Sequence, residues 1–211
     1  MYIEEPLKKY LDETASGAPT PGGGSVASLA GALGAALTSM VCNFTVGKEK
    51  YKDVEAEVAK ILSEAEELRA KLLDLMVEDT QVYSEVSKAY SMPRNTPEEK
   101  EARTQAIQKA LRIAMQAPLE TAFCCYKIMK LNEPLLDIGN QNLISDVGVA
   151  VLLAESALRS AILNVEINLS YIKDEEFCNN TRENLKTIVN ESSDIKLKIY
   201  DKVKEVIGAK L

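Results

Sequence analysis

Hydrophobic residues recur along this chain at spacings of three and four residues, the period of an amphipathic α-helix. No segment alternates between polar and apolar residues in the way that a half-buried strand does. The first predicted helix covers about residues 3–13, where Leu7 and Leu11 lie one turn apart. The pattern therefore predicts an all-α protein.

Turn and capping signals divide the rest of the chain into five further helices, giving a bundle of about six. Thr96-Pro-Glu-Glu99 is a capping box with proline at the first helical position, and Asp174 is placed to cap the last helix. Pro118 lacks a backbone N–H, so we expect the fourth helix to bend or break after Gln116. The predicted ranges are 25–45, 54–89, 96–131, 143–172 and 174–207.

The stretch between Ala15 and Gly47 contains no charged residue and includes the second predicted helix. Its small residues Ala27, Gly31 and Ala35 repeat every four positions, so neighbouring helices can approach closely. We expect it to be the long central helix of the bundle. The helix is long enough to cross a bilayer, but its Ala, Gly, Ser and Thr content favours a helix buried in a soluble protein.

The length of 211 residues suits one domain, which we assign to residues 1–211. The net charge is −7, and the 25 Lys and Arg residues are interspersed with 32 Asp and Glu residues, which argues against a nucleic-acid partner. The N-terminus lacks a basic segment followed by an apolar one. We therefore expect a cytoplasmic protein that does not bind a membrane.

Cys42, Cys124, Cys125 and Cys178 lack C-x-x-C spacing, and the chain has no histidine. The usual Cys/His zinc sites and His-based metal triads are therefore excluded. We interpret the cysteines as reduced core thiols and expect no metal site.

A glycine-rich loop leads into the second predicted helix. Glycine allows close approach, so the backbone N–H groups of Gly22, Gly23, Gly24 and Ser25 can converge on an anion or a carbonyl oxygen. The loop matches neither the Walker A motif nor the dinucleotide fingerprint, which disfavours a nucleotide ligand. The alternative is a flexible turn in which Ser25 is only an N-cap.

Two carboxylates are candidates for acid/base chemistry. Asp146 is the only charged residue between Asp137 and Glu155, so it is either a buried general acid or base or an N-terminal charge favoured by the helix dipole. Asp79, one turn before Tyr83, is a second acid/base candidate or a surface residue.

Asn164 and Asn168 lie one turn apart on one helix face, where their amides could bind a heterocycle or form hydrogen bonds between helices. Asp146 lies on the same face, five turns earlier. At ~1.5 Å per residue this is a separation of roughly 27 Å. Unless the helix breaks, Asp146 and Asn164 of one chain cannot contact the same small group.

Three lysines follow the second predicted helix, at positions 48, 50 and 52, with Tyr51 among them. Lys48 and its neighbours could bind an anionic ligand. The alternative is that they compensate the dipole at the C-terminal end of the helix.

Several separated motifs together resemble the cyclodeaminase/cyclohydrolase family of folate enzymes, which includes the C-terminal half of formiminotransferase-cyclodeaminase. The resemblance covers nearly the whole chain. The motifs that carry it are Pro21-Gly-Gly-Gly-Ser-Val-Ala, Leu29-Ala-Gly-Ala-Leu-Gly-Ala-Ala-Leu, Met40, Thr45, Gly47-Lys, Tyr51, Asp79, Tyr83, Ala117-Pro118, Gly139-Asn-Gln-Asn, Ser145-Asp146, Asn164-Val and Asn168.

The resemblance implies an all-helical homodimer that binds a tetrahydrofolate derivative, including polyglutamylated forms, and uses no cofactor beyond this substrate. It implies two related reactions: hydrolysis of 5,10-methenyltetrahydrofolate to 10-formyltetrahydrofolate, and formation of the methenyl compound from 5-formiminotetrahydrofolate with release of ammonia. Both pass through a tetrahedral carbon between two nitrogens and need a group that moves protons.

The candidate residues are assigned to these roles as hypotheses. Asp146 would be the general acid or base, with Asp79 as the alternative. The separation along the helix suggests a site shared between two subunits. The substrate-binding residues would be Gly22, Gly23, Gly24, Ser25, Lys48, Tyr51, Asn140, Asn142, Asn164 and Asn168.

Two other classes of protein are compatible with the same residues. One is a non-catalytic helical protein that binds folate or a protein partner, and the other is a dimerisation bundle with no ligand. The sequence alone does not distinguish the cyclohydrolase from the cyclodeaminase reaction. The isolated domain favours the cyclohydrolase, because nothing in the chain supplies a formimino group.

Overall fold

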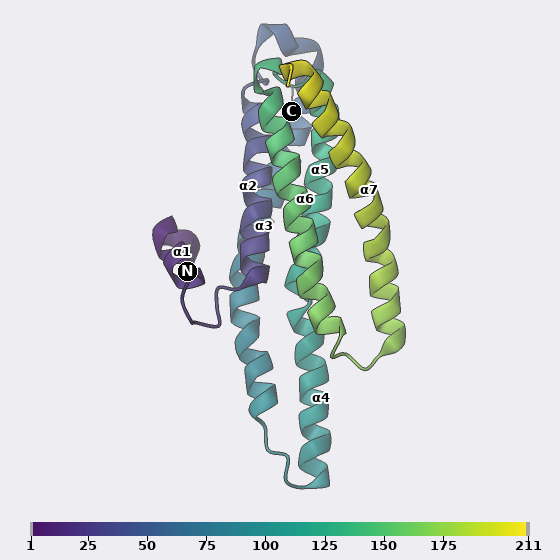
Figure 1. The fold of residues 1–211 in the computed structure, drawn as a ribbon. Helices are drawn as coiled ribbons and strands as arrows, with labels where there is room; N and C mark the ends of the chain where they lie inside the picture. The colour runs from purple at the N-terminus through teal and green to yellow at the C-terminus, as the bar shows by residue number, and fades with distance from the viewer. Residues whose placement is uncertain (1, 210–211) are drawn as a thin grey trace.

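The computed structural model describes residues 2–209, and within this range the chain forms seven α-helices, three short 3₁₀ segments and no strand (Figure 1). The prediction of an all-α fold is therefore confirmed. The 3₁₀ segments are Tyr2–Glu4, Glu49–Val54 and Gln141–Leu143. The helices are α1 Leu7–Thr14, α2 Gly23–Asn43, α3 Glu55–Ser91, α4 Pro97–Ala114, α5 Gln116–Ile138, α6 Ile144–Leu169 and α7 Glu175–Ile207.

Helix α2 lies at the centre of the bundle and packs against α3, α5 and α6. Its glycines permit this on two sides. A Cβ at Gly31 would lie 2.7 Å from Sγ of Cys125 on α5, and one at Gly34 would lie 2.9 Å from the carbonyl oxygen of Ala150 on α6. The prediction of a central helix that its neighbours approach closely is confirmed.

By length and composition, α2 is also the one helix in the described range that could cross a membrane. Most of its apolar window, 61%, is buried against the other helices. This degree of burial is typical of a core helix.

Most predicted helix boundaries agree with the structure to within a few residues, and the capping signals act as expected. The N–H of Glu99 donates to Oγ1 of Thr96 at 3.2 Å, completing the capping box. The N–H of Phe177 donates to Oδ1 of Asp174 at 3.0 Å, which starts α7.

Three boundaries differ from the prediction. The first helix begins at Leu7 because Pro6 occupies its N-cap and cannot continue a helix toward the N-terminus. The predicted break near Pro118 falls at Met115, where α4 ends and α5 begins. The fourth predicted helix was expected to end near residue 131, but α5 continues to Ile138, because buried Asn132 bonds within the helix and to α2.

Different helix termini meet at the two ends of the bundle. At one end α2 begins and α6 ends, and beside it α3 and α4 form a long hairpin that extends past the other helices (Figure 1). At the opposite end α2 finishes and α6 begins. Residues that are far apart in the sequence therefore meet at each end.

Candidate functional site

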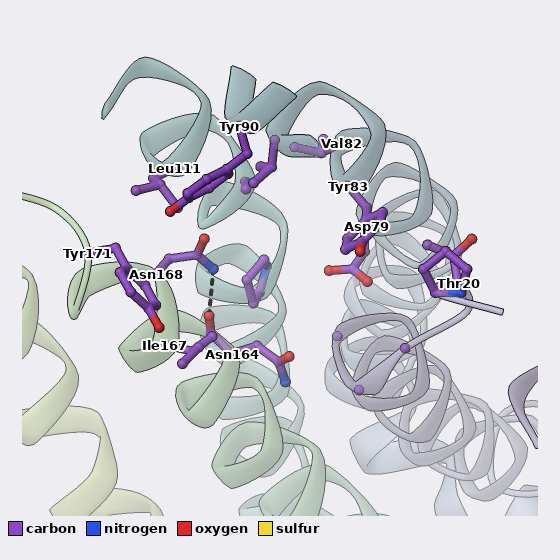
Figure 2. A pocket seen from close by; sticks show the side chains of 17 residues that line it. Thr20, Asp79, Val82, Tyr83, Tyr90, Leu111, Asn164, Ile167, Asn168 and Tyr171 are labelled. Atoms are coloured by element: carbon purple, nitrogen blue, oxygen red, sulfur yellow. Dashed lines mark hydrogen bonds between the residues drawn. The ribbon is translucent and has the colours of Figure 1, made fainter. Parts of the chain in front are cut away.

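A cavity of about 310 Å³ lies at the end of the bundle where α2 begins (Figure 2). Its wall comes from the loop before α2 and the first turn of α2, the C-terminal part of α3, the junction of α4 and α5, and the end of α6. The lining residues are Pro19, Thr20, Gly22, Gly23, Gly24, Asp79, Val82, Tyr83, Val86, Tyr90, Leu111, Ala114, Pro118, Asn164, Ile167, Asn168 and Tyr171.

Asp79 is the only acidic or basic side chain among these lining residues, and Gly24 in the first turn of α2 lies directly against it. A Cβ at residue 24 would lie 2.7 Å from Cγ of Asp79, so only glycine leaves room for the carboxylate there. The N–H of Ser25 donates to Oδ2 of Asp79 at 2.9 Å. The first turn of α2 therefore fixes the position of this carboxylate.

Burial raises the pKa of the Asp79 carboxyl, and the hydrogen bond from the Ser25 N–H opposes this shift. Oδ1 has no hydrogen-bond partner among residues 2–209. A carboxylate with a raised pKa and one unengaged oxygen on a cavity wall is suited to accept or donate a proton.

Ser25 itself is completely buried and does not line the cavity. Its hydroxyl donates to the carbonyl oxygen of Met76 at 3.0 Å and is 3.0 Å from the hydroxyl of Tyr10. The Ser25 side chain thus joins α1, α2 and α3, and it holds the loop in place instead of offering its hydroxyl to a ligand in the cavity.

Asn164 and Asn168 line the cavity together, as their spacing predicts. The side-chain NH₂ of Asn164 donates to the carbonyl oxygen of Ser160 at 2.9 Å, and that of Asn168 donates to the carbonyl oxygen of Asn164 at 2.8 Å. A Cβ at Gly23 would touch the Asn164 amide at 3.4 Å, so this side chain faces the glycine loop across the cavity (Figure 2).

Three tyrosines complete the wall, and two of them, Tyr90 and Tyr171, were missed in the sequence (Figure 2). A helical spacing signals each one. Tyr83 and Tyr90 follow Asp79 at four and eleven residues, which keeps all three on one face of α3. Tyr171 follows Asn168 by three residues, just beyond the end of α6.

The other predicted site residues lie at the opposite end of the bundle. Tyr51 donates to Oδ1 of Asn140 at 3.4 Å, and the same oxygen accepts the N–H of Asn142 at 3.1 Å. The N–H of Asn140 donates to Oγ1 of Thr45 at 3.0 Å. Lys48 precedes this cluster at the start of the 3₁₀ segment.

Asp146 lies in the first turn of α6, beside this second cluster and half-buried. Helix α6 is continuous from Ile144 to Leu169. Asp146 and Asn164 are therefore separated by roughly 27 Å along this helix, as expected for an unbroken helix. Within one chain the structure brings Asp79, the glycine loop and the two asparagines together, and it does not bring Asp146 to them.

A cavity of this kind, with aromatic and amide walls and one carboxylate, defines a small-molecule site suited to a flat, polar heterocycle. Among residues 2–209 no three Cys, Asp or Glu side chains are grouped closely enough to hold a metal ion. The class defined by the fold and the site is an all-helical protein that binds an organic ligand at the end of its bundle.

Comparison with known proteins identifies the family within this class. The family model for formiminotransferase-cyclodeaminase matches residues 6–187, and the chain belongs to this family. The resemblance noted from the sequence motifs is therefore confirmed.

Three relatives illustrate the relationship. A methenyltetrahydrofolate cyclohydrolase from Methylorubrum extorquens is 43% identical over 204 residues, covering 97% of this chain and 98% of the relative. The formimidoyltransferase-cyclodeaminase of Rattus norvegicus is 32% identical over 90% of this chain, which corresponds to only 35% of the rat protein. The crystal structure of formiminotetrahydrofolate cyclodeaminase from Thermotoga maritima superposes with a TM-score of 0.80 at 34% identity, covering 99% of this chain and 98% of the other.

Proposed function

We propose that this protein is a folate one-carbon enzyme that hydrolyses 5,10-methenyltetrahydrofolate to 10-formyltetrahydrofolate. The observation that carries the proposal is the Asp79 carboxylate, held by the Ser25 N–H on the wall of an otherwise uncharged, tyrosine-lined cavity. The full-length similarity to the Methylorubrum cyclohydrolase supports this choice of reaction.

The cavity suits such a substrate in shape and charge. Tyr83, Tyr90 and Tyr171 offer flat surfaces for a pterin ring, and the amides of Asn164 and Asn168 offer hydrogen-bonding groups for its polar edge. The methenyl carbon lies between two nitrogens that share a positive charge. A lone carboxylate in a partly desolvated site attracts that cation.

Asp79 would act as the proton acceptor in hydrolysis. Water attacks the methenyl carbon, and Asp79 takes one of its protons as the tetrahedral carbon forms. The bond from this carbon to N5 then breaks, N5 takes up the remaining hydroxyl proton, and the carbonyl of the 10-formyl group forms. One proton is released overall, in balance with the lost positive charge. Because burial raises its pKa, the Asp79 carboxylate is a stronger proton acceptor than an ordinary aspartate.

A second candidate is the cyclodeaminase reaction, which the similarity to the full-length Thermotoga structure favours. Here N10 attacks the formimino carbon and loses its proton to Asp79, and the leaving nitrogen is protonated and departs as ammonia. Both reactions use the same cavity and the same carboxylate. The difference lies in whether water or N10 is the nucleophile.

We further propose that the protein is a homodimer that pairs through α2 and α6. These helices lie side by side (Figure 1), and α5 packs against both of them. Their outward sides form an apolar face that carries no charge, whereas the Arg159 and Glu166 side chains of α6 turn toward α7. Exposed residues on this face are Val26, Leu33, Phe44, Val149, Leu152, Leu163 and Ile167.

Such a dimer would bring one end of the bundle in one subunit next to the opposite end of the bundle in its partner. If a two-fold axis crosses α6 near Ser156, the helices of the two subunits run antiparallel, and the Asp146 turn of one lies beside the Asn164–Asn168 turn of the other. Ile167 belongs both to the apolar face and to the cavity wall, so the cavity opens at the edge of this interface. Asp146 would then reach the substrate from the partner subunit.

The lysines at positions 48, 50 and 52 would lie near the same interface and could bind the glutamate tail of the folate. All four cysteines are free and buried, which supports a location in the reducing cytoplasm. We expect no cofactor beyond the folate and neither nucleic acid nor membrane as a partner.

One experiment separates these functions. The 5,10-methenyltetrahydrofolate absorbance is followed with purified protein, starting once from the methenyl and once from the 5-formimino compound. Enzyme-dependent loss in the first case indicates the cyclohydrolase, and appearance with ammonia release in the second indicates the cyclodeaminase. If folate binds and raises the melting temperature with no change in absorbance, the protein is a non-catalytic folate-binding protein.

A further inference from the structure

The N-terminal helix α1 is attached to the bundle mainly by one side chain. Within Leu7–Thr14, Tyr10 is the only buried residue, at 3% exposure, while Leu7 and Leu11 are largely exposed. In Figure 1, α1 lies apart from the other helices, beside the start of α2. Tyr10 is therefore the main contact between this segment and the first turn of α2, which forms part of the site.

The hydrogen bonds around Ser25 define the direction of the contact with Tyr10. The single hydroxyl hydrogen of Ser25 is used to donate to the carbonyl oxygen of Met76 at 3.0 Å. The Tyr10 hydroxyl, 3.0 Å away, must then be the donor to Oγ of Ser25. The result is a chain of two hydrogen bonds, from Tyr10 on α1 to Ser25 on α2 and from Ser25 to Met76 on α3. Met76 lies one turn before Asp79.

The backbone of Ser25 carries this chain to the carboxylate, because its N–H donates to Asp79 at 2.9 Å. Tyr10 is absent from the cavity wall and so does not touch a ligand there. A small movement of Ser25 would change the hydrogen bond that opposes the rise in the Asp79 pKa.

We propose that Tyr10 is a positioning residue for Asp79, acting through the hydroxyl and the backbone N–H of Ser25. This inference rests on the proposed function, because it assumes that Asp79 moves the proton. It assigns to α1 a role in the active site, although no α1 side chain lines the cavity.

The test compares two Tyr→Phe variants on the same N-terminal segment. Tyr10→Phe removes the donor to Ser25 and keeps the ring. Tyr2→Phe is the matched control, because Tyr2 packs edge-on against the Tyr10 ring at 5.4 Å, whereas the tyrosine hydroxyl beside Ser25 is that of Tyr10. We expect Tyr10→Phe to lower kcat roughly three- to tenfold, as the loss of one neutral hydrogen bond allows, and Tyr2→Phe to leave it unchanged.

A double-mutant cycle shows whether Tyr10 acts through Ser25. Once Ser25→Ala has removed the acceptor, adding Tyr10→Phe should lower kcat no further. A twofold or greater additional loss in the double variant, or equal kcat values for Tyr10→Phe and wild type, would overturn the proposal.

A measurement without turnover separates this proposal from the proposed function. The amide resonance of Ser25 in an NMR titration reports the protonation of Asp79, the only carboxylate on the described cavity wall. We expect the pH at the midpoint of this acid-range titration to be higher in Tyr10→Phe than in wild type, and to be unchanged in Tyr2→Phe. This shift in a protein that turns over no folate would support the positioning role and refute the enzyme, and an unchanged midpoint would refute the positioning role.

Discussion

Gly24 and Asp79 occupy adjoining space across α2 and α3: a Cβ at residue 24 would lie 2.7 Å from Cγ of Asp79. The contact explains why residue 24, in the first turn of α2, is glycine, because the carboxylate is placed where a side chain would otherwise be. The same turn supplies the Ser25 N–H that binds Oδ2. A local sequence feature of α2 thus determines the position of an acid on α3.

The first prediction concerns this contact. Gly24→Ala should force the Asp79 carboxylate to rotate away from the Ser25 N–H and lower kcat at least tenfold, since a charge-assisted hydrogen bond is worth about 1.5–3 kcal/mol. Gly17→Ala is the control, because a Cβ at residue 17 would have no other atom within 4 Å and residue 17 does not line the cavity. Equal kcat values for the two variants would show that the position of Asp79 does not matter.

The second prediction concerns stability and pH. Because burial raises the pKa of Asp79, its stabilising contribution is complete below the ordinary aspartate pKa of about 3.9 and is lost as the pH rises through the raised value. Asp79→Asn should therefore raise Tm at pH 7.5, by roughly 2–4 °C per kcal/mol, and the gain should shrink on acidification.

Thermal unfolding of Asp79→Asn at several pH values checks this prediction. Asp74→Asn provides the control, since Asp74 is exposed on the same helix. A gain in Tm that is independent of pH, or a variant that is less stable throughout, would contradict the account of a desolvated carboxylate.

The third prediction concerns the apolar face of α2 and α6. Leu163 is 72% exposed on this face, so Leu163→Glu should place two charges in the interface and convert the dimer to a monomer, as measured by light scattering. Leu197→Glu, at a 53% exposed position on α7, should leave the oligomeric state unchanged. A monomeric and fully active wild-type protein would refute both the dimer and the shared site.

The fourth prediction concerns the two aspartates. If Asp79 and Asp146 come from different subunits, each single variant is impaired, but a mixed dimer of Asp79→Asn and Asp146→Asn contains one intact site. Equal mixing with subunit exchange should then restore about one quarter of the wild-type activity. No restoration would refute the site shared between subunits, and near-normal turnover by Asp146→Asn alone would remove that residue from the site.

The sequence predicted the helices well because their signals are local. The capping box at Thr96, the cap at Asp174 and the small-residue spacing of α2 each act within a few residues. The error in α5 has the opposite origin. Asn132 reads as a helix end in the sequence, but its amide is buried and donates to Thr38 on another helix.

The site was predicted only in part, for a similar reason. Asp146 stands out in the sequence because apolar residues surround it, yet in the structure several of these form the outward face of α6 and not the wall of a cavity. Asp79 directly follows Glu78 on a helix rich in charged residues, so its sequence neighbours do not distinguish it from a surface carboxylate. Its contact with Gly24, and that of Tyr10 with Ser25, depend on how α1, α2 and α3 pack, which no local pattern records.

The central claim is that Asp79 moves the proton in a folate reaction. The most direct test measures turnover of 5,10-methenyltetrahydrofolate by wild-type protein and by Asp79→Asn, with the dissociation constant of each measured in parallel. The account predicts that kcat falls by about 10²–10⁴-fold while the dissociation constant changes only a few-fold. Unchanged turnover by Asp79→Asn, or a loss confined to binding, would contradict it.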